Sequence, residues 1–155
     1  YYLIIVEDDS SPYVKQLKER VNAKNKGDRI IFAGKRSDIS NILQSADIFV
    51  LPTIKKRGGE GSPVALLEAM ASGIPVLASN VSGSRDILSD KPGQLFLPEN
   101  TTSLLDKLNW IISLDKKNRD DLIQNQLEII DKKYSIEREV EQHELLYKNI
   151  FLHYA

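Results

Sequence analysis

The sequence contains no cysteine, and only two of its 155 residues are histidines. The absence of cysteine excludes disulfide bonds and thiolate metal sites. The two histidines, His143 and His153, lie ten residues apart, and no metal cluster or histidine-based nucleophilic triad is apparent around them. No apolar run reaches the roughly 18 residues that predict a membrane-spanning helix. We therefore expect a protein without metal ions and without a transmembrane segment.

The composition is typical of a single globular domain. Hydrophobic residues make up 41% and charged residues 28% of the chain, and the formal net charge is −1. A length of 155 residues is sufficient to bury a hydrophobic core. A net charge near zero gives no reason to expect a nucleic-acid partner. We therefore assign residues 1–155 to one domain.

Short apolar runs rich in Ile, Val and Phe alternate with helical patterns along the first hundred residues. This alternation predicts an α/β fold with a Rossmann-like parallel sheet and helices on both faces, followed by a helical C-terminal segment. In such sheets, ligands bind beyond the carboxyl ends of the strands. The expected strands are 1–6, 29–34, 47–52, 75–79 and 94–98, and the expected helices lie near 11–25, 38–45, 63–72 and 83–89.

The stretch "RGGEGSPVALLEAMASGIPVLAS", residues 57–79, contains the strongest site signal. Ser62 suits the N-cap of a helix and Pro63 its first position, while Gly73 and Pro75 end it. The first amides of such a helix have no partner within it and attract anions. We therefore expect an anion site at the amides of Val64, Ala65 and Leu66.

A glutamate, Glu68, lies inside this otherwise apolar helix. At about 100° per residue it shares a side with Val64 and Ala65, on a shoulder of small side chains where a carboxylate is partly desolvated and needs hydrogen-bond donors. A sugar or ribose ring offers paired hydroxyl donors of suitable size. The alternative is an ordinary solvated glutamate, but the cap, the glycines and the small neighbours favour a site.

These residues resemble a known family. The segment "EGSPVALLEAMASGIPVLAS" is similar to the donor-binding signature of retaining glycosyltransferases of the GT-B fold, the glycosyl transferases group 1 set (family 4). Its two glutamates, with seven residues between them, match Glu60 and Glu68. The preceding "FAGKRSDISNILQSADIFVLP" also resembles this family's strand–helix–strand unit. The similarity extends over nearly the whole chain.

The resemblance implies a role for each matching residue. Glu68 would bind the ribose hydroxyls of a nucleotide-sugar, and Glu60, the catalytic candidate, would contact the transferred sugar. The residues that flank the start of the helix would complete the sugar and diphosphate sites, and the "GKRSD" turn would flank the base. The "GKRSD" motif is equally consistent with an ordinary basic turn in which the cations form ion pairs with Asp38. The further candidates are Gly34, Lys35, Arg36, Gly61, Ser62, Pro63, Val64 and Ala65.

The family also implies what surrounds this domain. Its carboxy-terminal domain normally begins with one more strand, so the chain resembles a fragment of a two-domain enzyme, inactive without its amino-terminal domain. The implied substrate is a UDP- or GDP-sugar, with no cofactor and no metal. The acceptor glycan or glycolipid would bind mainly to the other domain. We expect bacterial surface polysaccharide or glycolipid synthesis in the cytoplasm, with peripheral membrane association of the full enzyme.

Two alternatives remain from other classes. The start "YLIIVEDDSSPYVKQLKE" resembles a receiver domain, a phosphorylation switch that uses Mg²⁺. A receiver needs an aspartate at the end of the third strand, where this sequence has Leu51, Pro52 and Thr53. The second alternative is a related nucleotide-sugar epimerase or a non-catalytic binding module. We expect the acidic terminal helix to be an ordinary packed helix, although the resemblance implies that this helix often reaches toward the partner domain.

Overall fold

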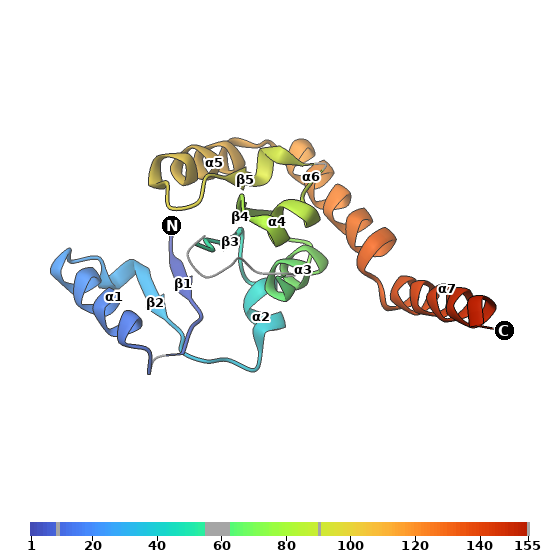
Figure 1. Ribbon diagram of the computed structural model, residues 1–155. Helices are drawn as coiled ribbons and strands as arrows, with labels where there is room; N and C mark the ends of the chain where they lie inside the picture. Colours follow the sequence, from blue (N-terminus) through green and yellow to red (C-terminus); the bar gives the residue numbers. More distant parts are fainter. Residues whose placement is uncertain (9, 55–62, 90, 155) are drawn as a thin grey trace. The chain divides into compact units, whose positions relative to one another are not determined.

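The computed structural model describes residues 1–8, 10–54, 63–89 and 91–154. The chain divides into two compact units, residues 1–39 and residues 40–155. Each unit contains its own parallel sheet among the described residues, two strands in the first and three in the second (Figure 1). The strands thus pair in two sheets, where the sequence suggested one.

The first unit is a β–α–β element. It consists of β1 (Leu3–Ile5), α1 (Pro12–Ala23), the short η1 (Gly27–Arg29) and β2 (Ile30–Phe32). Strands β1 and β2 are parallel, with Leu3 opposite Ile30. The helix begins after Ser11, which is extended, and Pro12 supplies the fixed φ that suits a first turn. Helix α1 packs through Val14, which is buried, and through Lys18, whose ammonium group lies 5.4 Å from the centre of the Phe32 ring.

The second unit contains a parallel sheet in the order β3–β4–β5. The central strand β4 is buried at all four of its residues, because its neighbours and the helices cover both of its faces. The elements that build this part are α2 (Ile39–Gln44), β3 (Phe49–Leu51), α3 (Val64–Ala71), β4 (Val76–Ser79), α4 (Ser82–Ile87), η3 (Pro92–Gln94) and β5 (Leu95–Phe96).

The rest of the second unit is helical. Asn100 caps the helix that begins at Thr101, and Asp115 caps the helix that begins at Lys116. Their side chains accept hydrogen bonds of 2.8 Å from the amides of Ser103 and Asn118, respectively. Helix α5 packs against β5 (Figure 1). Ile111 of this helix joins Leu77 and Phe96 in the hydrophobic core. These C-terminal elements are α5 (Thr101–Ser113), α6 (Lys116–Ile129), the π-helical η4 (Ile130–Tyr134) and α7 (Ile136–Tyr154).

A buried pair of side-chain amides joins α6 to the start of β4. Gln126 is fully buried, and its Oε1 accepts hydrogen bonds from the amide of Val76 (3.2 Å) and from Nε2 of Gln94 (2.7 Å). Its Nε2 donates to the carbonyl of Ile74 at 2.8 Å, and Gln94 Nε2 also donates to the carbonyl of Val76 at 2.9 Å. We call these two side chains the amide clamp. It supplies the hydrogen bonds that the start of β4 needs in the interior.

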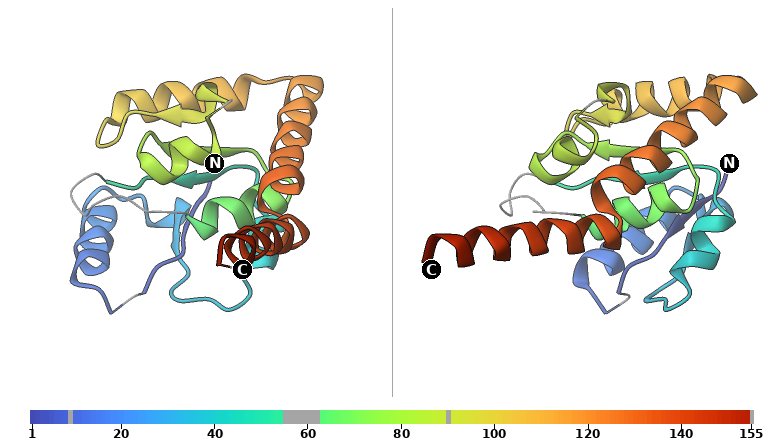
Figure 2. Two further views of the ribbon diagram at one scale, coloured as in Figure 1. Left: turned by 45° about the vertical axis from the view of Figure 1, so that its right-hand side comes forward. Right: turned by 90° about the vertical axis from the view of Figure 1, so that its right-hand side faces the viewer.

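Helix α7 differs from the expectation of an ordinary packed helix. Every residue from Ile136 to Phe151 is exposed, and the helix extends away from the rest of its unit (Figures 1 and 2). Its apolar side chains include Leu145, 61% exposed, and Phe151, 74% exposed. The expectation of a packed terminal helix is therefore wrong for this chain. Among the described helices, none is both long enough and apolar enough to cross a membrane.

Candidate functional site

Helix α3 begins one residue later than expected. Pro63 has extended ψ (96°) and precedes the helix, which starts at Val64. The amide of Leu66 donates to the carbonyl of Pro63 at 3.0 Å, so the prediction that it is free is wrong. The amides of Val64 and Ala65 have no hydrogen-bond partner among the described residues. The unpaired donors of the helix start are therefore these two.

One side of α3 faces the core and the other faces solvent. Leu66, Ala69 and Met70 are fully buried. Glu68 is exposed, as are Val64 and Ala65 on the same side. The expected partial desolvation of Glu68 is not found, because the small side chains beside it do not cover the carboxylate. The Glu68 carboxylate is therefore accessible to solvent, on the same side of α3 as Val64 and Ala65.

Helix α3 ends as the sequence predicts. Ser72 Oγ donates to the carbonyl of Glu68 at 2.8 Å, and the amide of Gly73 donates to the carbonyl of Met70 at 3.1 Å. Gly73 has φ +72°, the left-handed region in which a side chain is strained. The end of the helix that carries Glu68 thus depends on a glycine.

We expect Gly73→Ala to lower the free energy of unfolding by roughly 1–2 kcal/mol, the cost of holding a Cβ in the left-handed region. A Cβ at this position would meet its nearest neighbour, Ile123, at an ordinary 3.9 Å, so strain rather than a clash sets the effect. Urea denaturation measures it. Gly93→Ala is the matched control, because Gly93 does not adopt a positive φ and its added Cβ would also make ordinary contacts. Equal losses in both variants would contradict this account.

The carboxyl end of β4 carries polar atoms that sequence reasoning did not single out. Ser79 Oγ, Asn80 Oδ1 and Ser84 Oγ are buried and have no hydrogen-bond partner in the described part of the chain. A buried polar atom without a partner costs about 1–3 kcal/mol and calls for an explanation. Because serine and asparagine are also common in ordinary turns after a strand, the sequence alone does not mark these residues as part of a binding site. Their place at the ligand edge of the sheet makes them candidates.

The predicted base-flanking turn belongs to the first unit. Gly34 has φ +67°, which allows the chain to turn after β2. The Arg36 guanidinium donates two hydrogen bonds to Asp38, of 2.8 and 2.6 Å, and these bonds hold the pKa of the Asp38 carboxyl below its usual value. Lys35 is exposed. Arg36 is thus already paired, as the alternative interpretation of a self-contained basic turn expects.

Three of the predicted site residues, Glu60, Gly61 and Ser62, lie outside the described residues. Their assignments to the transferred sugar stay predictions. The second unit does bring together Pro63, Val64, Ala65 and Glu68, because one helix carries them or begins at them. Among the described residues, no group of three or more acidic or histidine side chains is arranged to hold a metal ion.

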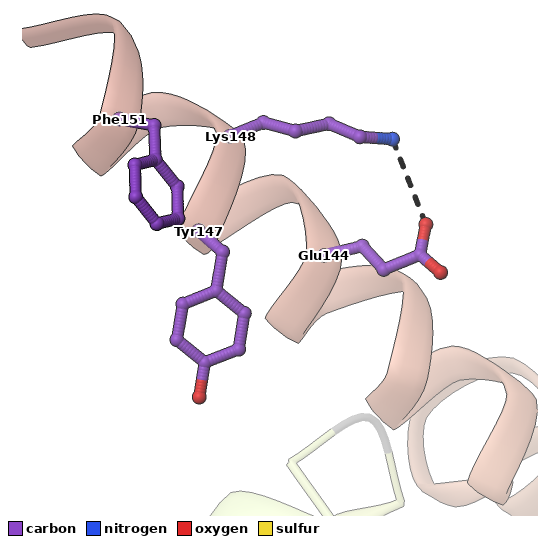
Figure 3. A pocket seen from close by; sticks show the side chains of 4 residues that line it. All are labelled: Glu144, Tyr147, Lys148 and Phe151. Atoms are coloured by element: carbon purple, nitrogen blue, oxygen red, sulfur yellow. Dashed lines mark ion pairs between the residues drawn. The ribbon is translucent and has the colours of Figure 1, made fainter. Parts of the chain in front are cut away.

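A separate hollow of about 530 Å³ lies along α7. Glu144, Tyr147, Lys148 and Phe151 line it, and all four project from the same helix (Figure 3). Lys148 and Glu144 form an ion pair at 3.6 Å across one turn. Side chains of a single exposed helix do not enclose a ligand on several sides. The hollow therefore does not belong to the site predicted at the start of α3.

Parallel strands flanked by helices, with a helix start at the carboxyl edge of the sheet, define a nucleotide-binding type of α/β architecture. The match to a family model is more specific: residues 1–128 match Glycosyl transferases group 1. The chain belongs to this family, which excludes the receiver alternative. Its fold is that of the GT-B glycosyltransferases, as the sequence predicted.

Similar proteins agree with this assignment. The chain is 40% identical over 63 residues to the UDP-Gal:alpha-D-GlcNAc-diphosphoundecaprenol alpha-1,3-galactosyltransferase of Escherichia coli, covering 41% of this chain and 15% of that protein. It is 31% identical over 97 residues to the lipopolysaccharide core biosynthesis mannosyltransferase LpsB of Rhizobium meliloti, covering 61% of this chain and 26% of that protein. The chain thus spans about a quarter or less of these two relatives.

A solved structure shows the same fold. Anabaena Alr3699/HepE, in complex with UDP and glucose, superimposes with a TM-score of 0.80 at 22% sequence identity. The match covers 95% of this chain and 40% of that chain. At this level of identity the likeness supports the architecture alone.

Proposed function

We propose that this chain is the donor-binding part of a retaining glycosyltransferase. It would bind a nucleoside diphosphate sugar, and the complete enzyme would transfer the sugar to a hydroxyl of a lipid-linked saccharide. Two relatives support the substrate classes: the E. coli protein is named for UDP-Gal and a diphosphoundecaprenol acceptor, and HepE was solved with UDP and glucose.

One observation carries the proposal. Helix α3 presents the exposed Glu68 on the same side as Val64 and Ala65, whose amides have no partner among the described residues. Two amides at a helix start suit a diphosphate, and a carboxylate one turn further suits the paired hydroxyls of a ribose. A nucleoside diphosphate contains both groups joined together.

The reaction follows from this placement. The bond between the anomeric carbon and the diphosphate oxygen breaks, and the acceptor oxygen forms the new bond on the same face of the sugar. The proton of the acceptor hydroxyl passes to an oxygen of the departing diphosphate. The departing diphosphate gains negative charge as its bond breaks. The amides of Val64 and Ala65 would stabilise that charge without reorganising, and one such donor is typically worth about 3 kcal/mol of barrier. Glu60 stays the predicted contact for the transferred sugar.

Titration calorimetry of this chain with UDP, GDP and their sugars tests the proposal. We expect binding of at least one of these nucleotides, unchanged when a chelator removes divalent metal, because peptide amides and not a cation would hold the diphosphate. The nucleotide that binds would also identify the base. Absence of heat with every nucleotide, together with no protection against thermal unfolding, would contradict donor binding.

A further inference from the structure

Positive charge is concentrated in one short segment of the chain. Residues 12–29 contain six lysines and arginines against two acidic residues, a net charge of +4. The other residues carry −5, so that the total is −1. The near-neutral total therefore conceals a separation of charge, and the absence of a net positive charge does not exclude an anionic partner for this segment.

The cations of α1 and of its C-cap have different surroundings. Lys15 is exposed, roughly on the opposite side of the helix from Tyr13. Lys18 is half-buried and lies over the Phe32 ring, so it contributes to packing. Arg20 and Lys24 are exposed, and at about 100° per residue they follow Tyr13 along one side of the helix. Tyr13 is itself 64% exposed. An aromatic ring and two cations thus form a stripe on the accessible side of the helix.

The turn after α1 continues this stripe. Lys26 and Arg29 are exposed, and none of these four cations forms an ion pair with another described residue. We call Tyr13, Arg20, Lys24, Lys26 and Arg29 the basic surface. Beside it lies a hollow of about 270 Å³. Its lining is polar, and the residues that form it are Asn22, Asn25, Gly27 and Asp28.

Favourable interaction with the helix dipole accounts for part of this charge. Arg20 lies in the last turn of α1 and Lys24 is its C-cap, where cations are stabilising. Lys26 and Arg29 lie beyond the end of the helix, where this effect has fallen off. Helix stability alone does not explain four unpaired cations within ten residues.

We propose that the basic surface docks on an anionic membrane. Cations near such a membrane are attracted by its negative surface potential, and a tyrosine suits the headgroup region with its ring in the apolar boundary and its hydroxyl in water. The polar hollow offers the side-chain amides of Asn22 and Asn25 to headgroup hydroxyls, while Asp28 in its lining disfavours a phosphate there. The choice of a membrane over a nucleic acid rests on the lipid-linked acceptor of the proposed function, which would be embedded in a bilayer.

Vesicle flotation with the purified chain, without nucleotide, tests the proposal. We expect binding to vesicles of phosphatidylcholine mixed with phosphatidylglycerol, weak binding to phosphatidylcholine alone, and release at high salt. The double variant Arg20→Glu, Lys24→Glu should bind the anionic vesicles at least about 25-fold more weakly, because each cation near the surface contributes a factor of about five.

A matched control reverses the same number of charges elsewhere. Lys116→Glu with Lys117→Glu changes two exposed lysines at the start of α6, in the other unit, and should bind anionic vesicles nearly as well as the unaltered chain. Circular dichroism verifies that both double variants are folded. Equal losses in the two would mean that total charge, not the basic surface, governs binding, and would overturn the proposal.

Two other results would also overturn it. Equal binding to neutral and anionic vesicles would assign the attraction to exposed apolar side chains, such as those of α7. Binding to an RNA or DNA duplex, lost in the Arg20–Lys24 variant, with no binding to vesicles, would assign the surface to nucleic acid. Calorimetry with UDP and GDP on the same variant separates this proposal from the proposed function, since donor binding uses α3.

Discussion

Replacing Gln126 by alanine is expected to lower the free energy of unfolding by about 3–5 kcal/mol. The substitution would leave the Val76 amide and the Ile74 carbonyl without this buried partner. Gln94 would lose one of its two hydrogen bonds and keep the one to the Val76 carbonyl. Each unpaired buried group costs about 1–3 kcal/mol, and a cavity adds to the sum. Because a globular domain is stable by only about 5–15 kcal/mol, the variant should lose much of its stability. Urea denaturation followed by circular dichroism measures the change.

The chain supplies a matched control for this experiment on the same helix. Gln124 lies two residues earlier in α6 and is exposed, so Gln124→Ala removes the same atoms with little effect on stability. A Gln126→Ala variant as stable as Gln124→Ala would show that water replaces the lost partner. The amide clamp would then contribute little to the free energy of unfolding.

Replacing Glu68 by glutamine is expected to weaken binding of the nucleotide-sugar donor about 10- to 100-fold. A carboxylate that accepts two ribose hydroxyls contributes about 1.5–3 kcal/mol, and an amide accepts at only one of its two positions. Stability should not change, because Glu68 is exposed and its side chain makes no hydrogen bond with another described residue. Calorimetry with the nucleotide that binds the unaltered chain gives the ratio of affinities.

Glu139→Gln, on the exposed helix α7, is the control for Glu68→Gln and should leave the affinity for the nucleotide unchanged.

A comparison of two nucleotides tests the ribose assignment directly. Replacing the donor by its 2′-deoxy analogue should weaken binding to the unaltered chain but have a smaller effect on Glu68→Gln, because the partner of that hydroxyl is already altered. Equal sensitivity of both proteins to the missing hydroxyl would place Glu68 away from the ribose.

The order and type of the elements were predictable from the sequence. Each expected strand contains an observed one, and β4 shows why: "PVLAS" is a short apolar run with a proline before it, and all of the strand is buried. The exact first and last residues of the helices and strands were predicted less well. Pro63 was expected inside α3 and lies just before it, because proline suits both positions through its fixed φ.

Features that depend on distant partners were not predictable. The sequence around Gln126 does not distinguish it from Gln124. Only the fold brings Ile74 and Val76 within hydrogen-bond distance of Gln126. The exposure of α7 was missed for a similar reason. A helix with an apolar stripe is normally taken as packed, and the described residues place no neighbour over Ile136–Phe151.

The amide clamp links the interior of the sheet to a helix that is synthesised late. Val76 finds its partner 50 positions further along the chain, so β4 cannot complete its hydrogen bonds while α6 is still inside the ribosome. A stop codon between α5 and α6, or loss of the chain beyond a protease cut there, would leave the Val76 amide and the Ile74 carbonyl without their partner at the start of the central strand. Any shortened version of this protein that is to remain folded must therefore extend beyond residue 126.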